Sequence, residues 1–296
     1  EKRKTLGVVD VLKDIKKKQE GTVYGILFAN GNELKYAPVD KDYNLTSDPK
    51  KLAAASDDIW TICAAKGEIY FGGQDGCVNA FFARTSQKID SKVYDIFMHK
   101  NKILCGTVNY LYDMEKNSAL LKKHLCMESF SLDTGDNLYV IVNDKAGKGR
   151  SLRHVKENKG KYSIDASVLK YEVDHNVICQ AKVIPEGPVL FGVDRKCHDF
   201  SIISCVNLKY LDINGKKVKG SETKDKKSIV RVELLNSNSD KIDVLYSNSN
   251  LDEVIFATID LNENAILNKK SLIPGKGSSA LEPVRNYELH SKLMEE

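Results

Sequence analysis

The stretch Ile69-Tyr70-Phe71-Gly72-Gly73-Gln74-Asp75-Gly76 decides the fold prediction, because its pattern recurs along the chain. A short apolar run is followed by small residues and then by a polar turn. The pattern returns as Ile103-Leu104-Cys105-Gly106-Thr107-Val108-Asn109 and as Val189-Leu190-Phe191-Gly192-Val193-Asp194-Arg195. Looser copies lie at residues 26–31, 138–144 and 244–248. Repetition at tens of residues is typical of repeat architectures, so the chain is predicted to consist of similar structural units.

Each unit is predicted to be an antiparallel meander of short strands. The clearest unit has strands over residues 59–65, 68–73 and 77–84, and residues 87–90 offer a short fourth strand. The turns between them contain Lys66-Gly67 and Asp75-Gly76. Asp-Gly or Asn-Gly between apolar runs is a strong hairpin signal. The same arrangement repeats between residues 92 and 123, which favours local strand pairing throughout.

Several segments are less regular. Residues 6–12 are apolar and β-branched and are predicted as a strand, and residues 200–211 form one long β-prone segment. Residues 52–55 are helix-tolerant, although the run is brief. The tail after residue 273 is rich in Pro, Gly and Ser and offers a last strand over residues 283–289.

These units predict an all-β fold, a β-propeller of about six to seven four-stranded antiparallel blades. A four-stranded meander cannot bury both of its faces alone, whereas sheets stacked around an axis bury them against each other. A two-sheet sandwich is the alternative, but it needs Greek-key crossovers where this chain repeats local hairpins. A seventh blade would have to combine the tail with an N-terminal strand. We predict a single domain over residues 1–296, with blades at roughly 5–56, 57–91, 92–124, 125–169, 170–223 and 224–296.

The segment from Ile69 to Phe82 resembles the middle of a WD40 repeat. Both have an apolar strand, small residues, an Asp-Gly turn and a second apolar strand. The Gly-His and Trp-Asp dipeptides of that family are absent, and the single tryptophan, Trp60, lies in a first-strand position. The resemblance implies a WD40-like propeller architecture.

Composition limits the function classes. Lys and Arg number 45 against 41 Asp and Glu, a net charge of +4, whereas DNA-binding domains usually carry a stronger and more clustered excess. No apolar stretch approaches the ~20 residues that span a bilayer, and the N-terminal residues do not follow a signal-peptide pattern. Most of the seven cysteines lie in apolar runs and none forms a CxxC pair, which predicts reduced core thiols and a cytoplasmic or otherwise intracellular protein.

Motifs for catalysis, metal or cofactor binding are missing from the sequence. The six histidines form no HxH, HExxH or HxxxH pair, and Cys197-His198 with Cys205 matches no usual zinc spacing. The run Gly147-Lys148-Gly149-Arg150 lacks the Ser or Thr of a P-loop and is predicted to be a basic hairpin loop. We therefore predict no catalytic residue, no metal site and no cofactor.

A binding surface is instead predicted from topology. In a propeller, the turns after the second strands and the links between blades lie at one face, and rigid scaffolds often carry binding residues on such loops. The alternative is that the same residues are simply good turn formers. The polar residues expected to gather on this rim are Asn30, Gln74, Asp75, Asn109, Tyr110, Lys145, Lys148, Arg150, Asp194, Arg195, His198, Asn248 and Asn250.

Function remains open between classes. The first hypothesis is a scaffold or adaptor that holds a protein partner on one face, as a monomer or within an assembly. The alternative is a hydrolase or lyase with a site at the central channel, which requires acids and a histidine to converge on one pocket. Nucleic-acid binding is a third hypothesis, because residues 16–18 and 224–227 are Lys-rich, although few aromatics are interleaved with them.

Overall fold

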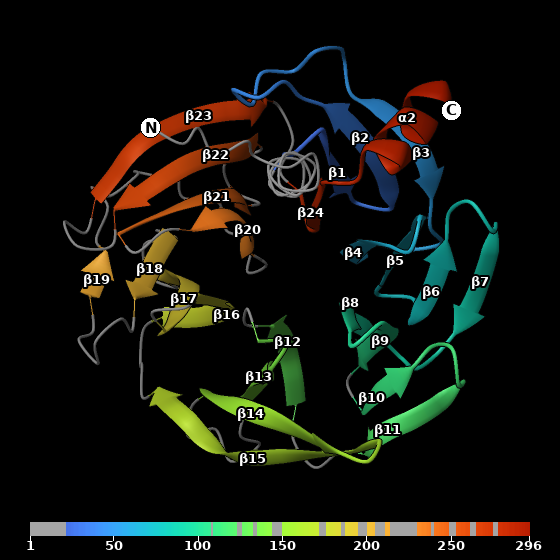
Figure 1. Ribbon diagram of the computed structural model, residues 1–296, viewed down its shortest axis with the longest axis vertical. Helices are drawn as coiled ribbons and strands as arrows, with labels where there is room; N and C mark the ends of the chain where they lie inside the picture. The colour runs from blue at the N-terminus through green and yellow to red at the C-terminus, as the bar shows by residue number, and fades with distance from the viewer. Residues whose placement is uncertain are drawn as a thin grey trace, which may run out of the picture.

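Within the residues that the computed structural model describes, six four-stranded antiparallel sheets surround a central axis (Figure 1). The structure describes residues 22–107, 109–122, 126–132, 135–143, 150–171, 176–184, 187–194, 200–204, 211–213, 230–237, 240–248, 253–260, 265–274 and 278–296. Neighbouring sheets face one another around the ring, so the blades are radial and the two-layer sandwich is wrong. The predicted all-β propeller with four-stranded antiparallel blades is confirmed.

Five of the sheets are consecutive meanders whose first strand lies nearest the axis (Figure 1). The second sheet contains β4 (Ile59–Ala65), β5 (Glu68–Gly73), β6 (Cys77–Ala80) and β7 (Thr85–Lys88), and the third contains β8 (Val93–His99), β9 (Lys102–Thr107), β10 (Tyr110–Asp113) and β11 (Ser118–Lys122). The fourth contains β12 (Cys126–Leu132), β13 (Leu138–Asn143), β14 (Arg150–Asn158) and β15 (Lys161–Tyr171). The fifth contains β16 (Asn176–Ile184), β17 (Gly187–Asp194), β18 (Phe200–Ser204) and β19 (Leu211–Ile213), and the sixth contains β20 (Val230–Ser237), β21 (Lys241–Asn248), β22 (Glu253–Asp260) and β23 (Ala265–Ile273).

The first sheet closes the ring with strands from both ends of the chain. It contains β1 (Gly25–Asn30), β2 (Glu33–Pro38) and β3 (Lys50–Ala54), and β24 (Leu281–Val284) supplies its innermost strand. β24 runs antiparallel to β1, with Gly25 opposite Val284. The tail therefore pairs with N-terminal strands, as the sequence analysis considered for a seventh blade, but the sheet that it completes is the first one. The strand predicted over residues 6–12 lies outside the described residues.

The predicted last strand over residues 283–289 is wrong beyond Val284, because β24 ends at that residue and the helix α2 (Tyr287–Glu295) begins three residues later. The Asn286 side chain accepts a hydrogen bond from the Leu289 backbone N–H and caps the helix. Leu289 and Leu293, one turn apart, are both buried against the propeller. Residues 52–55 are not helical, since β3 covers most of them. The long segment predicted over residues 200–211 holds β18 and the first residue of β19, and residues 205–210 lie outside the described part.

The hydrophobic core is divided into layers between neighbouring sheets. One layer joins the second and third sheets and includes Cys63, Val78, Val93 and Cys105. Another joins the third and fourth sheets, and two more lie on either side of the first sheet. Cys63 and Cys105 are buried free thiols, which confirms the predicted core role for these two, whereas Cys77 is half-buried.

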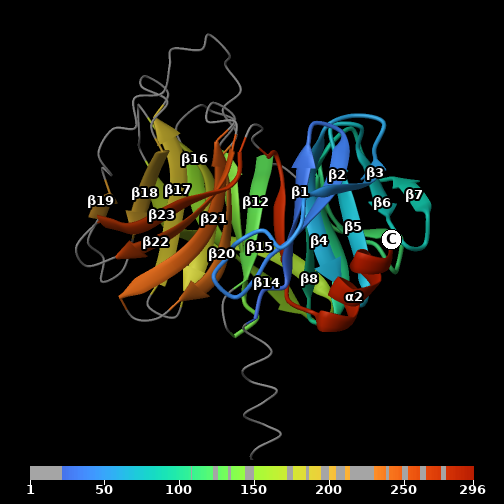
Figure 2. The same ribbon diagram turned by 90° about the horizontal axis from the view of Figure 1, so that it is seen from above.

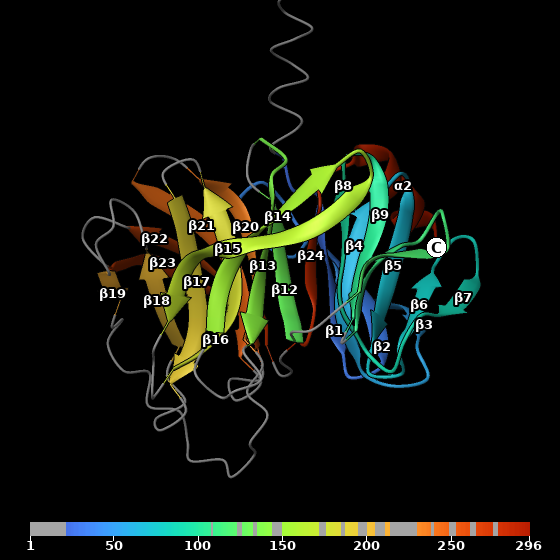
Figure 3. The ribbon, with the colours of Figure 1, turned by 90° about the horizontal axis from the view of Figure 1, so that it is seen from below.

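The two ends of the propeller differ (Figures 2 and 3). We call the end that carries the turns after Asn30, Gly73 and Thr107 the turn face. α2 lies at the opposite end, as the views from above and from below show. Among the described residues, no helix has the length and hydropathy that crossing a bilayer requires.

Candidate functional site

The described members of the predicted rim lie on the turn face. Asn30 ends β1, Gln74 and Asp75 form the β5–β6 turn, and Asn109 and Tyr110 lie at the β9–β10 turn. Backbone hydrogen bonds join these turns to the links between sheets. The Gln74 N–H donates to the Asp58 carbonyl at 3.0 Å, the Ile59 N–H to the Gly31 carbonyl at 3.0 Å, and the Ile89 N–H to the Gly76 carbonyl at 2.9 Å. In the first and second blades, the described turns are therefore tied to the links that follow them.

Asp75 shapes its own turn. Its carboxylate accepts hydrogen bonds from the Cys77 backbone N–H at 2.9 Å and from the Ser56 hydroxyl. These contacts fit a turn-forming role, and a binding role for Asp75 stays a prediction.

Asn109 is held by Asp90, a residue of the link between the second and third sheets. The Asp90 carboxylate accepts hydrogen bonds from the Thr107 hydroxyl at 2.7 Å and from the Asn109 backbone and side chain, each at 3.2 Å. Burial by itself would raise the pKa of Asp90, but hydrogen bonds from Thr107, Ser91 and Asn109 outweigh it and hold the pKa below its usual value. Asp90 therefore stays ionised and fixes the β9–β10 turn.

The other predicted rim residues are placed less completely. Arg150 begins β14, Asp194 ends β17 and Asn248 ends β21, and these backbone positions flank the turns after the second strands of their sheets. The side chains of these three are not described. Lys145, Lys148, Arg195, His198 and Asn250 lie outside the described residues.

A cavity of about 390 Å³ lies on the axis, lined by the innermost strands β4, β8, β12, β20 and β24. Three carboxylates line it, from Asp95, Glu233 and Glu282. Asp95 Oδ2 accepts the Phe130 backbone N–H at 2.9 Å, and Glu282 Oε1 accepts the Ala64 backbone N–H at 3.2 Å. Each of these two bonds joins innermost strands of neighbouring sheets, so the two carboxylates hold blades together.

The position of Asp95 is repeated in the preceding blade. Thr61 precedes Asp95 by 34 residues, and its hydroxyl oxygen accepts the Ile96 backbone N–H at 2.9 Å. In both cases a polar side chain of one blade accepts the N–H that lies 35 residues further along the chain. The repeat therefore extends to a polar contact between blades that the apolar pattern did not show.

The described channel residues do not form the constellation that the enzymatic alternative requires. No histidine is among the described residues that line the cavity. Burial raises the pKa of the Cys63 thiol well above its usual value, and the negative charges of Glu282, Asp95 and Glu233 add to this effect. A protonated thiol is a poor nucleophile. Within the described residues, no group of three His, Cys, Asp or Glu side chains is arranged to hold a metal ion.

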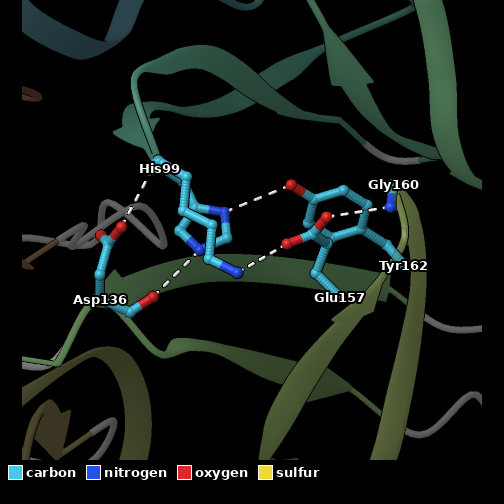
Figure 4. A network of polar contacts seen from close by, with 6 residues as sticks. His99, Asp136, Glu157, Gly160 and Tyr162 are labelled. Carbon is cyan, nitrogen blue, oxygen red and sulfur yellow. Dashed lines mark hydrogen bonds and ion pairs between the residues drawn. The ribbon is translucent and has the colours of Figure 1, made fainter.

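The buried His99 lies at the opposite end and joins the third and fourth blades (Figure 4). Its Nε2 lies 3.0 Å from the Asp136 carbonyl oxygen, and its Nδ1 lies 3.4 Å from the Tyr162 hydroxyl. Beside it, Lys100 forms an ion pair of 2.6 Å with Glu157. Since these groups satisfy one another between the β8–β9 turn and the fourth sheet, the network fits a contact that locks two blades.

Sequence reasoning missed an aromatic pair near the turn-face end of the channel. The Trp60 and Tyr94 rings stack with centroids 5.6 Å apart and planes at 22°, and both side chains are half-buried. Lys92 Nζ lies 5.3 Å from the Trp60 ring centroid. The 34-residue spacing of Trp60 and Tyr94, each directly before the equivalent residues Thr61 and Asp95, was the available signal.

The fold is shared with structures of very different sequence. A structure of a nidogen/laminin complex aligns with a TM-score of 0.57 at 11% identity, over 87% of this chain and 97% of that chain. The WD40 β-propeller domain of Doa1 aligns with a TM-score of 0.53 at 10% identity, over 87% and 81%. Hydrazine synthase of Kuenenia stuttgartiensis aligns with a TM-score of 0.54 at 9% identity, over 84% and 82%. The WD40-like architecture predicted from the sequence is thus confirmed as a fold.

No protein-family model matches the chain, and a search of curated proteins finds no match. At identities of 9–11%, the structural likeness establishes the fold alone.

Proposed function

We propose that this propeller is a protein-binding scaffold or adaptor that holds its partner on the turn face. The observation that carries the proposal is the half-buried Trp60–Tyr94 pair beside turns that are hydrogen-bonded to the links between blades. Tyr and Trp supply large contact areas at little cost in conformational entropy and are enriched among residues that dominate binding energy.

The hydrogen bonds of the channel carboxylates favour a binding role over a catalytic one. Asp95 and Glu282 accept hydrogen bonds from backbone N–H groups of neighbouring blades. A general acid or base has to be within hydrogen-bond reach of a substrate proton, and a carboxylate engaged in holding the fold is poorly suited to that role. No observation among the described residues favours the hydrolase or lyase alternative, and the structural relatives include both a WD40 domain and a synthase, so the fold does not decide between them.

Site-specific photo-crosslinking tests the proposal. A benzophenone amino acid is placed at Gln74 or at Asn109 on the turn face, and at the exposed positions Glu115 or Lys159 at the opposite end as matched controls. The protein is then irradiated in extracts of its source cells. We expect discrete adducts from the turn face and few from the controls. Equal labelling from both ends, or adducts from the opposite end only, would contradict the proposal.

A further inference from the structure

We propose that the Trp60–Tyr94 pair is the anchor of the turn face and that it takes a basic side chain, Arg or Lys, from the protein partner. This inference rests on the proposed scaffold function and adds the chemistry of the partner. It is carried by the geometry of the two rings, by the cation already beside one of them and by the charges around them.

Both rings occupy β-bulge positions. Ile59 pairs with Gly73 and Thr61 with Gly72, so Trp60 has no partner residue on β5. In the next blade, Val93 pairs with Thr107 and Asp95 with Gly106, which leaves Tyr94 without one on β9.

A bulge turns a side chain away from the regular alternation of the strand. Here it brings two aromatic rings from neighbouring blades into contact one residue inside the turn-face end of the channel, and Trp60 lines the axial cavity. The equivalent bulges therefore place the two rings side by side near the turn-face end, and one of them, Trp60, lines the cavity.

The Trp60 ring already attracts a cation. The faces of aromatic rings are electronegative, and an ammonium or guanidinium group within about 6 Å of the centroid is stabilised there. Lys92 Nζ lies 5.3 Å from the Trp60 centroid. A cation from a partner would take the same kind of position on the pair and would meet the charge of Lys92 there.

Among the described residues, the turns and links around the pair carry more acidic than basic groups, with four aspartates against Lys88, which donates to the Asp75 carbonyl, and Lys92. Asp57, Asp58, Asp75 and Asp90 all lie on the turn face, and all four are half-buried or exposed. Within the described residues, no ion pair joins any of the four to a Lys, Arg or His. Negative potential around an aromatic pair is complementary to a basic segment. The described part of this face therefore favours a basic partner over an acidic one.

The experiment uses Trp60 as its own probe, because it is the single tryptophan of the chain. The full-length protein is titrated with a synthetic peptide that carries three arginines separated by Gly and Ser, and with a matched peptide that carries glutamates instead. We expect saturable quenching of Trp60 emission by the arginine peptide. A fluorescein-labelled arginine peptide, followed by anisotropy, then measures the affinity of the variants.

The variants separate an anchor from a general charge effect. W60L is expected to weaken binding about fivefold, the equivalent of about 1 kcal/mol for a cation–π contact, while W60F retains part of the affinity. K92Q is expected to strengthen binding two- to fivefold, because it removes the competing cation. The matched control is K292Q. Lys292 belongs to α2 at the opposite end, where its Nζ lies 5.7 Å from the centroid of the Phe82 ring. This substitution is expected to leave the affinity for the arginine peptide unchanged. Circular dichroism establishes that each variant is folded.

Three outcomes would overturn the inference: tighter binding of the glutamate peptide, unchanged affinity in folded W60L, or equal gains from K92Q and K292Q. If any of these occurs while photo-crosslinking still maps partners to the turn face, the scaffold function stands and the anchor is wrong. Absence of crosslinks at the turn face would instead refute the scaffold function itself.

Discussion

Two glycines with the same backbone conformation allow a direct test of how closely the turn-face loops approach the links. Gly67 has φ +73° and Gly76 has φ +70°, so an alanine at either position has to adopt the left-handed conformation. A Cβ at Gly67 would have no neighbouring atom within 4 Å, whereas a Cβ at Gly76 would lie 1.9 Å from the Asp90 carbonyl oxygen. The two substitutions therefore share the conformational cost and differ in the steric one.

The expected magnitudes follow from this difference. G67A should lower the free energy of unfolding by about 1 kcal/mol, the cost of a left-handed non-glycine residue. G76A should lower it by roughly 1–3 kcal/mol more, because the backbone around Asp90 has to move. Urea unfolding followed by Trp60 fluorescence measures both, and the thermal midpoint of G76A should fall below that of G67A by about 2 °C per kcal/mol. If G76A proves no more destabilising than G67A, the close packing of turn and link is wrong.

Three further predictions concern polar contacts. D95A should lower the free energy of unfolding by about 1.5–3 kcal/mol, measured by urea unfolding, because it leaves the Phe130 N–H without its charged acceptor, and D95N should recover part of the loss. Asp90 has a folded-state pKa below its usual value, so its contribution to the free energy of unfolding is present above pH ~4 and is lost as the pH falls through the folded pKa. In urea unfolding between pH 2 and 5, the free energy of unfolding of D90N should therefore fall less with decreasing pH than that of the wild type. Burial lowers the pKa of His290, whose Nδ1 lies 2.6 Å from the Tyr36 hydroxyl, so docking of α2 should weaken as the pH falls below ~6.5. Hydrogen-exchange protection factors, which are corrected for the intrinsic pH dependence of exchange, should therefore fall in α2 at low pH in the wild type, be reduced already at neutral pH in Y36F, and not change with pH in H290Q.

The strands were predictable because their signals are local. The turn Asp75-Gly76 and the apolar runs on either side of it specify a hairpin within about fifteen residues, and β5 and β6 begin where the pattern indicated. The repeat of that hairpin then implied radial stacking, since isolated four-stranded sheets do not bury their faces.

The helix was not predictable in the same way. α2 has nine residues, fewer than an isolated helix needs for stability in water. It is stabilised by the burial of Leu289 and Leu293 against the first two blades and by the Asn286 cap. Those contacts depend on the position that β24 gives the tail beside β1, which the local sequence of a Pro-, Gly- and Ser-rich tail does not indicate.

The aromatic pair was missed for a related reason. A bulge shifts the register of one strand against its partner, and that shift is set by pairing, so the apolar pattern of β4 alone gives no sign that Trp60 leaves the regular alternation. The placement of predicted rim residues at turns followed from topology, whereas the residues that make the turn face chemically distinctive depend on register.

The polar channel has a physical explanation that does not involve chemistry on a substrate. The innermost strand of each blade is hydrogen-bonded to another strand on one side only. Some of its backbone N–H groups therefore point toward the axis and need acceptors. Thr61, Asp95 and Glu282 supply them, and each does so for the innermost strand of the following blade. An apolar side chain in their place would leave a backbone donor unsatisfied at a blade junction. Carboxylates on the axis of a propeller are therefore expected even where no reaction takes place. Residues outside these hydrogen bonds between blades say more about function. Trp60 is such a residue, because it occupies a bulge position outside the strand register and stacks half-buried on Tyr94, the residue at the equivalent bulge of the next blade.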